Sequence, residues 1–84
     1  MDSKHRKTLE AIFEKPELAN IVWRDIEAIF IALGAEVTEG SGSRVRVALK
    51  NVRAVFHRPH PRKEANKATI RSARRFLEAA GEKP

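Results

Sequence analysis

A change of hydrophobic period at Gly34 constrains the fold of this chain more than any other feature. Before Gly34 the apolar residues follow helical spacing, as do Val22, Ile26, Ile29, Phe30 and Leu33. After it, in residues 44–49, the apolar side chains of Val45, Val47 and Leu49 alternate along the chain. Side chains return to one face of a helix every three to four residues, and to one face of a strand every two. The chain therefore combines helices with half-buried strands, which is the α+β class.

The sequence predicts the order α-α-β-β-β-α. The first five elements are expected over residues 3–14, 22–33, 35–39, 44–49 and 52–57. Ser3 is expected to cap the first helix, and Asn66 to cap a last helix that stops at Gly81. The three strands follow one another closely, so we expect a three-stranded antiparallel sheet with one face packed on the helices.

The register of the last two strands follows from the short connection between them. A two-residue hairpin loop at Lys50-Asn51 pairs Leu49 with Val52 and, further along, brings position 44 opposite position 57. Strand alternation then sends the valines to the helices and leaves a second face to solvent or a ligand. That open face is expected to carry Arg44, Arg46, Arg53 and His57, with the side chains of positions 44 and 57 about 5 Å apart at Cβ.

Positive charge is concentrated in one half of the chain. Residues 40–76 contain eleven of the 17 Lys and Arg residues and one acid, Glu64, although the net charge of the whole chain is only +6. No acid alternates with the arginines of the predicted second and third strands, so phosphate is a better partner for them than a neighbouring carboxylate. A basic surface of this kind favours a polyanion such as RNA. The alternatives are a solvated face, or a face that meets an acidic protein.

The composition limits the remaining classes of protein. A chain of 84 residues is enough for one domain, residues 1–84, with one core. It has no cysteine, which removes disulfides and thiolate metal sites and fits a reducing cytoplasm. We expect neither a signal peptide nor a membrane span, because the polar start of the chain is followed by no long apolar run.

Two of the three histidines lie within the basic residues 40–76, in Phe56-His57-Arg58-Pro59-His60-Pro61. An imidazole can take a proton from a ribose 2′-hydroxyl or give one to a leaving 5′-oxygen near neutral pH, so His57 and His60 are the catalytic candidates. Passive phosphate or backbone contacts are the alternative. No carboxylate or thiolate completes a metal site with them, and we expect neither a metal nor another cofactor. The other candidate RNA contacts are Arg44, Arg46, Arg53, Arg58, Arg62, Lys63 and Arg74.

Several short motifs occur in an order that resembles HicA toxins of bacterial toxin–antitoxin systems. They are Trp23-Arg24-Asp25-Ile26, Leu33-Gly34-Ala35-Glu36-Val37, Gly42-Ser43 entering a strand, and Arg58-Pro59-His60-Pro61 before a helix with Thr69-Ile70-Arg71. The resemblance covers residues 20–81. It implies a fold similar to double-stranded-RNA-binding domains and activity as a ribosome-independent mRNA endonuclease. It also implies a HicB antitoxin that covers the active surface.

The chain departs from the family at one position. HicA toxins commonly carry their catalytic histidine directly after Gly-Ser, whereas Arg44 follows Gly42-Ser43 here. Arginine keeps its proton and cannot serve as an ordinary base. Either His57 or His60 supplies the imidazole, or the chain binds RNA without cutting it efficiently, and the register favours His57. We therefore expect a toxin that cleaves mRNA by metal-independent 2′-hydroxyl attack. The alternatives are a non-catalytic RNA-binding module and a basic protein for an acidic partner.

Overall fold

The computed structural model describes residues 2–84, and its elements follow the predicted order. They are α1 (Ser3–Ile12), α2 (Trp23–Ala32), β1 (Glu36–Glu39), β2 (Arg44–Leu49), β3 (Val52–His57) and α3 (Lys67–Ala79). The strands form one antiparallel sheet in the order β1-β2-β3, so the α+β class and the three-stranded sheet are confirmed. No helix within residues 2–84 has the length and hydrophobicity needed to cross a membrane.

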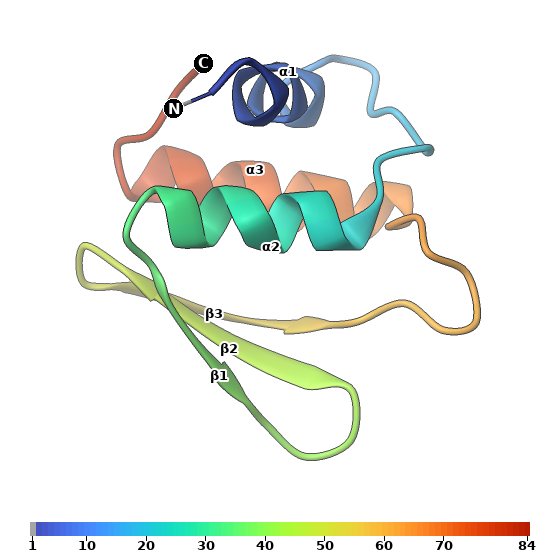
Figure 1. Ribbon diagram of the computed structural model, residues 1–84, viewed down its shortest axis with the longest axis vertical. Helices are drawn as coiled ribbons and strands as arrows, with labels where there is room; N and C mark the ends of the chain where they lie inside the picture. Colours follow the sequence, from blue (N-terminus) through green and yellow to red (C-terminus); the bar gives the residue numbers. More distant parts are fainter. Residues whose placement is uncertain (1) are drawn as a thin grey trace.

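The helices all lie on one side of the sheet. Figure 1 shows α2 and α3 next to the sheet and α1 beyond them, on the side of these helices that faces away from the strands. α1 contacts both α2 and α3, while α2 contacts β1 and α3 contacts β3. The other face of the sheet carries no helix, as the alternation of β2 predicts (Figure 1).

Aromatic rings occupy the layer between the helices and the sheet. Phe30 of α2 lies 5.4 Å from Phe56 of β3 and 5.2 Å from Phe76 of α3, measured between ring centroids, and Trp23 lies 5.4 Å from Phe56. All four rings are buried, as expected from the sequence. Such packing contributes both buried apolar area and favourable edge-to-face contacts. The aromatic side chains are therefore used in the core and leave none on the open face of the sheet.

The helix ends follow from capping side chains and glycines. Asn66 accepts a hydrogen bond from the Thr69 amide at 2.8 Å, which confirms the predicted cap of α3. The prediction of Ser3 as the cap of α1 is wrong. Asp2 holds that place in extended backbone and accepts from the His5 amide at 2.8 Å, so Ser3 lies inside the first turn. Gly34 follows α2 with φ of 97°, a conformation that glycine adopts without steric cost.

The β2–β3 hairpin has the predicted register. Lys50 and Asn51 have φ of 49° and 68°, and two residues in the left-handed region make the kind of two-residue loop that matches the twist of the strands. The loop pairs Leu49 with Val52 and Arg44 with His57. Because side chains alternate along a strand, this register buries Val45, Val47 and Leu49 and exposes Arg44 and Arg46.

We expect Phe30→Ala to lower the free energy of unfolding by about 3–5 kcal/mol, because it empties a buried position between two other rings. Urea denaturation followed by circular dichroism measures this change. Ile31→Ala is the matched control, since its side chain is 58% exposed in the same helix, and it should change stability by less than about 0.5 kcal/mol. Similar losses in the two variants would contradict the aromatic core.

Candidate functional site

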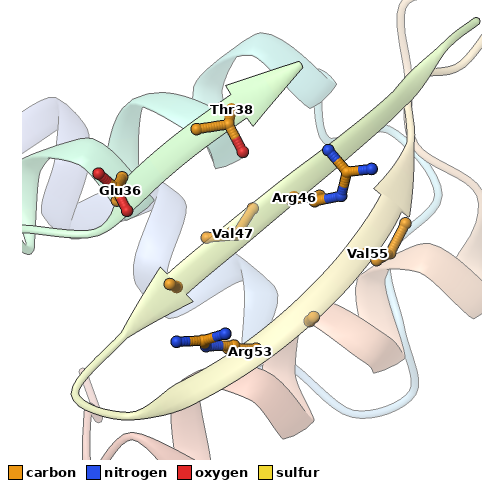
Figure 2. Close-up of a pocket in the computed structure, with 8 residues that line it drawn as sticks. Glu36, Thr38, Arg46, Val47, Arg53 and Val55 are labelled. Atoms are coloured by element: carbon orange, nitrogen blue, oxygen red, sulfur yellow. The ribbon is translucent and has the colours of Figure 1, made fainter. Parts of the chain in front are cut away.

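The open face of the sheet consists of three rows of side chains that run across the strands. The register places Glu36, Ala48 and Arg53 in one row, Thr38, Arg46 and Val55 in the next, and Arg44 with His57 in the third. Figure 2 shows Glu36 and Thr38 of β1 on the same side of the sheet as Arg46 of β2 and Arg53 of β3. The predicted grouping of Arg44, Arg46, Arg53 and His57 on one face is therefore present in the structure.

In the third row, Arg44 and His57 form the type of cross-strand pair that has the shorter Cα–Cα distance in an antiparallel sheet. The Arg58 amide donates to the Ser43 carbonyl at 2.9 Å, so Ser43 and Arg58 form a hydrogen-bonded pair. Hydrogen-bonded and non-hydrogen-bonded pairs alternate, which makes Arg44 and His57 a non-hydrogen-bonded pair with Cα atoms about 4.5 Å apart. Side chains of such pairs are nearest neighbours across two strands. A group bound by one of them can contact the other.

Gly40 leaves room beside this pair. Its amide donates to the Arg44 carbonyl at 2.9 Å, so it lies opposite Arg44 on the side away from His57. A Cβ at position 40 would lie 3.0 Å from the Arg44 Cβ, closer than side chains normally approach. The Arg44 side chain therefore has His57 on one flank and only a glycine on the other, which leaves space for a ligand.

The cations of the open face are exposed and lack carboxylate partners. Arg44, Arg46, Arg53 and His57 are all exposed, and none of them forms an ion pair within residues 2–84. The Arg46 guanidinium donates only a long hydrogen bond, 3.5 Å, to the Glu39 carbonyl. Their donors are therefore available to an anion, and guanidinium groups suit phosphate oxygens in particular.

Two side chains on this face were not predicted from the sequence. Glu36 and Thr38 flank Val37, which is paired with the buried Val47, so both point to the open face. The strands that carry the arginines contain no acid, as expected, but β1 adds the Glu36 carboxylate to the same face. The same alternation that placed the arginines would have placed Glu36, had it been applied to the first strand.

Arg58, a predicted RNA contact, is held by two carboxylates instead. Its Nε lies 2.9 Å from Glu27 Oε1 and its Nη1 lies 2.7 Å from Glu39 Oε1. The hydrogen bonds that Arg58 donates to Glu27 and to Glu39 raise the pKa of Arg58, and the hydrogen bond from Arg58 lowers the pKa of Glu39. The indole of Trp23 also donates to Glu27, at 2.6 Å. Arg58 thus ties the start of the β3–α3 loop to α2 and β1, and its Nε, Nη1 and Nη2 all donate to carboxylates of the chain itself.

Arg74 was also predicted to contact RNA, and its burial argues against that role. The residue is 7% exposed, and its guanidinium donates to the Glu17 carboxylate and, at 3.3 Å, to the Glu14 carbonyl. The Arg74 hydrogen bond lowers the pKa of Glu17. A cation buried this deeply needs such partners, because its desolvation is otherwise costly. Arg74 therefore fixes the α1–α2 connection against α3.

The remaining candidates lie in the loop between β3 and α3. His60, Arg62 and Lys63 are exposed, and the side chain of His60 makes no hydrogen bond or ion pair within the described residues. Backbone hydrogen bonds join the end of this loop to the start of α2, from the Trp23 amide to the Lys63 carbonyl at 3.0 Å, and to the residue two positions earlier, from the Ala65 amide to the Ile21 carbonyl at 2.8 Å. The ion pairs of Arg58 hold the start of the same loop. Within residues 2–84 no three His, Asp or Glu side chains are grouped as metal ligands.

A comparison with protein families gives the class of this chain. A family model described as the HicA toxin of bacterial toxin–antitoxin systems matches residues 23–81. This match covers well over half of the chain, and the chain belongs to the HicA toxin family. No curated protein and no solved structure matches it. Helix α1 lies outside the matched residues, whereas the whole sheet, α2 and α3 lie within them.

Replacing Arg58 tests its structural role. We expect Arg58→Ala to lower the free energy of unfolding by about 1–3 kcal/mol, because the partly buried Glu27 carboxylate loses its cation. Glu39 has a lowered pKa in the folded state, so its contribution is present above its unfolded pKa and is lost as pH falls through the folded value. The loss of stability below about pH 4.5 should therefore be shallower in Arg58→Ala than in the unchanged protein.

Urea denaturation at several pH values measures both effects. Arg75→Ala is the control, because Arg75 is exposed on α3 and forms no ion pair within residues 2–84. It should leave stability and its pH dependence unchanged within about 0.5 kcal/mol. Parallel pH profiles for the unchanged protein and Arg58→Ala would show that Arg58 does not act through Glu39.

Proposed function

We propose that this HicA-family chain is an endoribonuclease that cuts mRNA on the open face of its sheet. The observation that carries the proposal is the Arg44–His57 pair, which joins a proton-transfer group to a phosphate-binding group at the closest cross-strand spacing. Arg46 and Arg53 add two more exposed guanidinium groups on the same face. The concentration of positive charge without carboxylate partners suits a polyanionic substrate.

The reaction needs a base, an acid and stabilisation of charge on phosphorus. In our proposal His57 takes the proton from a ribose 2′-hydroxyl while the O2′–P bond forms and the P–O5′ bond breaks. The leaving 5′-oxygen takes a proton from His60 or from water, and the products are a 2′,3′-cyclic phosphate and a 5′-hydroxyl. Arg44 donates to the non-bridging phosphate oxygens, where negative charge increases in the transition state. No step of this scheme uses a metal ion.

The other cations then bind the RNA on either side of the cut. Arg46 and Arg53 extend from the reacting pair along the open face, while Arg62 and Lys63 extend the basic surface into the loop after β3. Phosphate contacts of this kind hold a strand in register without reading its sequence. With no aromatic side chain on the open face, the bound RNA is held without stacking on aromatic rings.

The partner that controls such a toxin is, in this proposal, a HicB-like antitoxin protein that forms a hetero-oligomer with it and covers the open face. The exposed arginines favour a partner that places acidic side chains against them. We place the toxin in the cytoplasm, where mRNA is found and where the absence of cysteine is no disadvantage.

A second candidate function is RNA binding without cleavage, and Arg44 itself favours it. This residue follows Gly42-Ser43, where members of the family commonly carry their catalytic histidine. If no other imidazole acts in its place, the same basic face binds RNA and leaves it intact. Cleavage and binding therefore have to be measured separately.

We expect the purified protein to cut RNA in the presence of EDTA and to leave 2′,3′-cyclic phosphate ends. His57→Ala should lower the rate of cutting by about 10²–10⁴-fold, the usual contribution of general acid–base catalysis, while RNA affinity changes little. Gel analysis of end-labelled RNA measures the rate, and filter binding measures the affinity. His5→Ala in α1 is the control and should cut at the normal rate.

Two outcomes would contradict the assignment. Undiminished cutting by His57→Ala would remove His57 from the mechanism. Binding of RNA with no cutting by the unchanged protein would favour the non-catalytic candidate. His60→Ala distinguishes the proposed acid from the base, because it should slow cutting and remove the fall in rate at high pH, while the fall at low pH, which reports protonation of His57, is unchanged.

We also expect each arginine of the open face to contribute one phosphate contact. Single Arg44→Ala, Arg46→Ala and Arg53→Ala variants should each weaken RNA binding and reduce the slope of log K against log salt concentration by about 0.7. Filter binding over a series of salt concentrations measures the slope. Arg75→Ala, which removes one exposed charge from α3, should leave the slope unchanged. An equal effect of all four variants would mean that only net charge matters.

A further inference from the structure

A shallow hollow of about 510 Å³ lies on the open face, beside the Arg44–His57 pair but separate from it. Figure 2 shows it bounded by side chains from all three strands. The outward side chains around it are those of Glu36, Thr38, Arg46, Ala48, Arg53 and Val55. The hollow combines an apolar floor with polar groups at its rim, which is how small-ligand sites are usually built.

Two side chains of opposite charge, Glu36 and Arg53, lie on opposite sides of this hollow and form no ion pair with each other. Glu36 and Arg53 belong to the same row, on β1 and β3, with Ala48 of β2 between them. Two strand spacings separate their backbones by roughly 10 Å. Neither side chain forms an ion pair within residues 2–84, and both are exposed. The short side chain of Ala48 leaves the space between them open.

A ligand that fits this row must offer hydrogen-bond donors at one end and an anion at the other. The Glu36 carboxylate can only accept hydrogen bonds, through two neighbouring oxygens. The Arg53 guanidinium can only donate them, and it matches phosphate oxygens. A nucleotide has both ends, with its base at one side and its phosphate at the other.

We propose that the hollow is a guanine-binding subsite for the RNA, a proposal that rests on the function proposed above. Guanine presents two adjacent N–H donors, N1–H and the 2-amino group, which match the two oxygens of Glu36. Adenine and cytosine place a ring nitrogen acceptor beside their amino group, and that acceptor repels a carboxylate. Uracil has a single N–H between two carbonyl oxygens. Only guanine therefore offers a bidentate edge to Glu36, and Arg53 binds its phosphate.

The neighbouring row supplies the rest of the subsite. Val55 of this row forms the apolar floor together with Ala48 of the Glu36 row, and Val55 is 56% exposed although it is a large apolar residue. Arg46 lies on β2 in the row next to the Arg44–His57 pair, where the flat face of its guanidinium can cover a base plane while its N–H groups donate to a phosphate. Unstacked bases in RNA are commonly held in this manner, on a guanidinium plane with their Watson–Crick edge hydrogen-bonded.

The distance between the subsite and the Arg44–His57 pair indicates that the bound guanine belongs to a nucleotide beside the cut bond. Ala48 and Arg44 are four residues apart on β2, so the row of Glu36, Ala48 and Arg53 lies roughly 13 Å from the reacting pair, with the Arg46 row between them. The bound guanine is therefore at a fixed distance from the cut bond and is not part of the cleaved linkage. The consequence is a preference for guanine at one place beside the cleavage site.

Titration with the four nucleoside 5′-monophosphates, followed by the backbone amide signals in NMR spectra, tests the subsite directly. Guanosine 5′-monophosphate should shift the amides of Glu36, Ala48 and Arg53 and bind about five- to tenfold more tightly than the uridine nucleotide. Glu36→Gln should remove this difference, because an amide offers one acceptor instead of two. Glu78→Gln, an equal change of charge on exposed α3, is the control and should retain it.

Cleavage mapping separates the subsite from the proposed function. The unchanged protein should cut RNA with guanine enriched at one fixed position beside the cut, and Glu36→Gln should lose that enrichment. Cutting without any guanine preference, with all four nucleotides bound equally, would overturn the subsite and leave the ribonuclease proposal standing. Selective binding of guanosine 5′-monophosphate by a protein that cuts no RNA would support the subsite and overturn the cleavage proposal.

A protein occupant of the hollow is the remaining outcome. An antitoxin could place a lysine on Glu36 and a carboxylate on Arg53. In that case Glu36→Gln would weaken the complex with the antitoxin while the four nucleotides bound with equal affinity, and this pair of results would overturn the guanine assignment.

Discussion

The two-residue turn at Lys50-Asn51 is the constraint on which the rest of the structure depends. With both residues in the left-handed region, the loop has one geometry and sets one register between β2 and β3. A shift of one residue would send Val45 and Val47 to solvent and the arginines into the aromatic core. The burial of the valines and the exposure of Arg44 and His57 therefore have a single cause. The turn determines both the stability of the fold and the composition of the candidate site.

Not all of the positive charge in residues 40–76 belongs to the open face. Arg58 and Arg74 are bound by carboxylates from residues 1–39, the acidic half of the chain, which holds eight acids and five Lys or Arg residues. The partners are Glu27 and Glu39 for Arg58 and Glu17 for Arg74. These pairs join the sheet, the loop after β3 and the connection before α2 to the helices. The acidic half is thus a source of structural partners. It neutralises the arginines that hold the fold together and leaves those of the open face unpaired.

Contacts that depend on neighbouring residues could be predicted from the sequence, whereas contacts between distant parts of the chain could not. Alternation in β2 and β3 depends on local chemistry alone, so the open face and its Arg44–His57 pair were predictable from the sequence. The pairing of Arg74 with Glu17 joins residues 57 positions apart, and no local pattern marks it. Charge counting therefore assigned Arg74 to the surface. The cap of α1 was missed for a smaller reason, since Asp2 and Ser3 are both good caps and lie next to each other.

The place of Arg44 and His57 in the register also bears on how this chain differs from its family. In the proposed mechanism an imidazole at position 57 acts in place of one at position 44. The two positions are the nearest cross-strand neighbours, and their side chains share one face. A histidine at position 57 lies about one strand spacing from position 44, and the Arg44 guanidinium occupies the position where the family commonly has its histidine. A phosphate bound between the two strands would contact both Arg44 and His57.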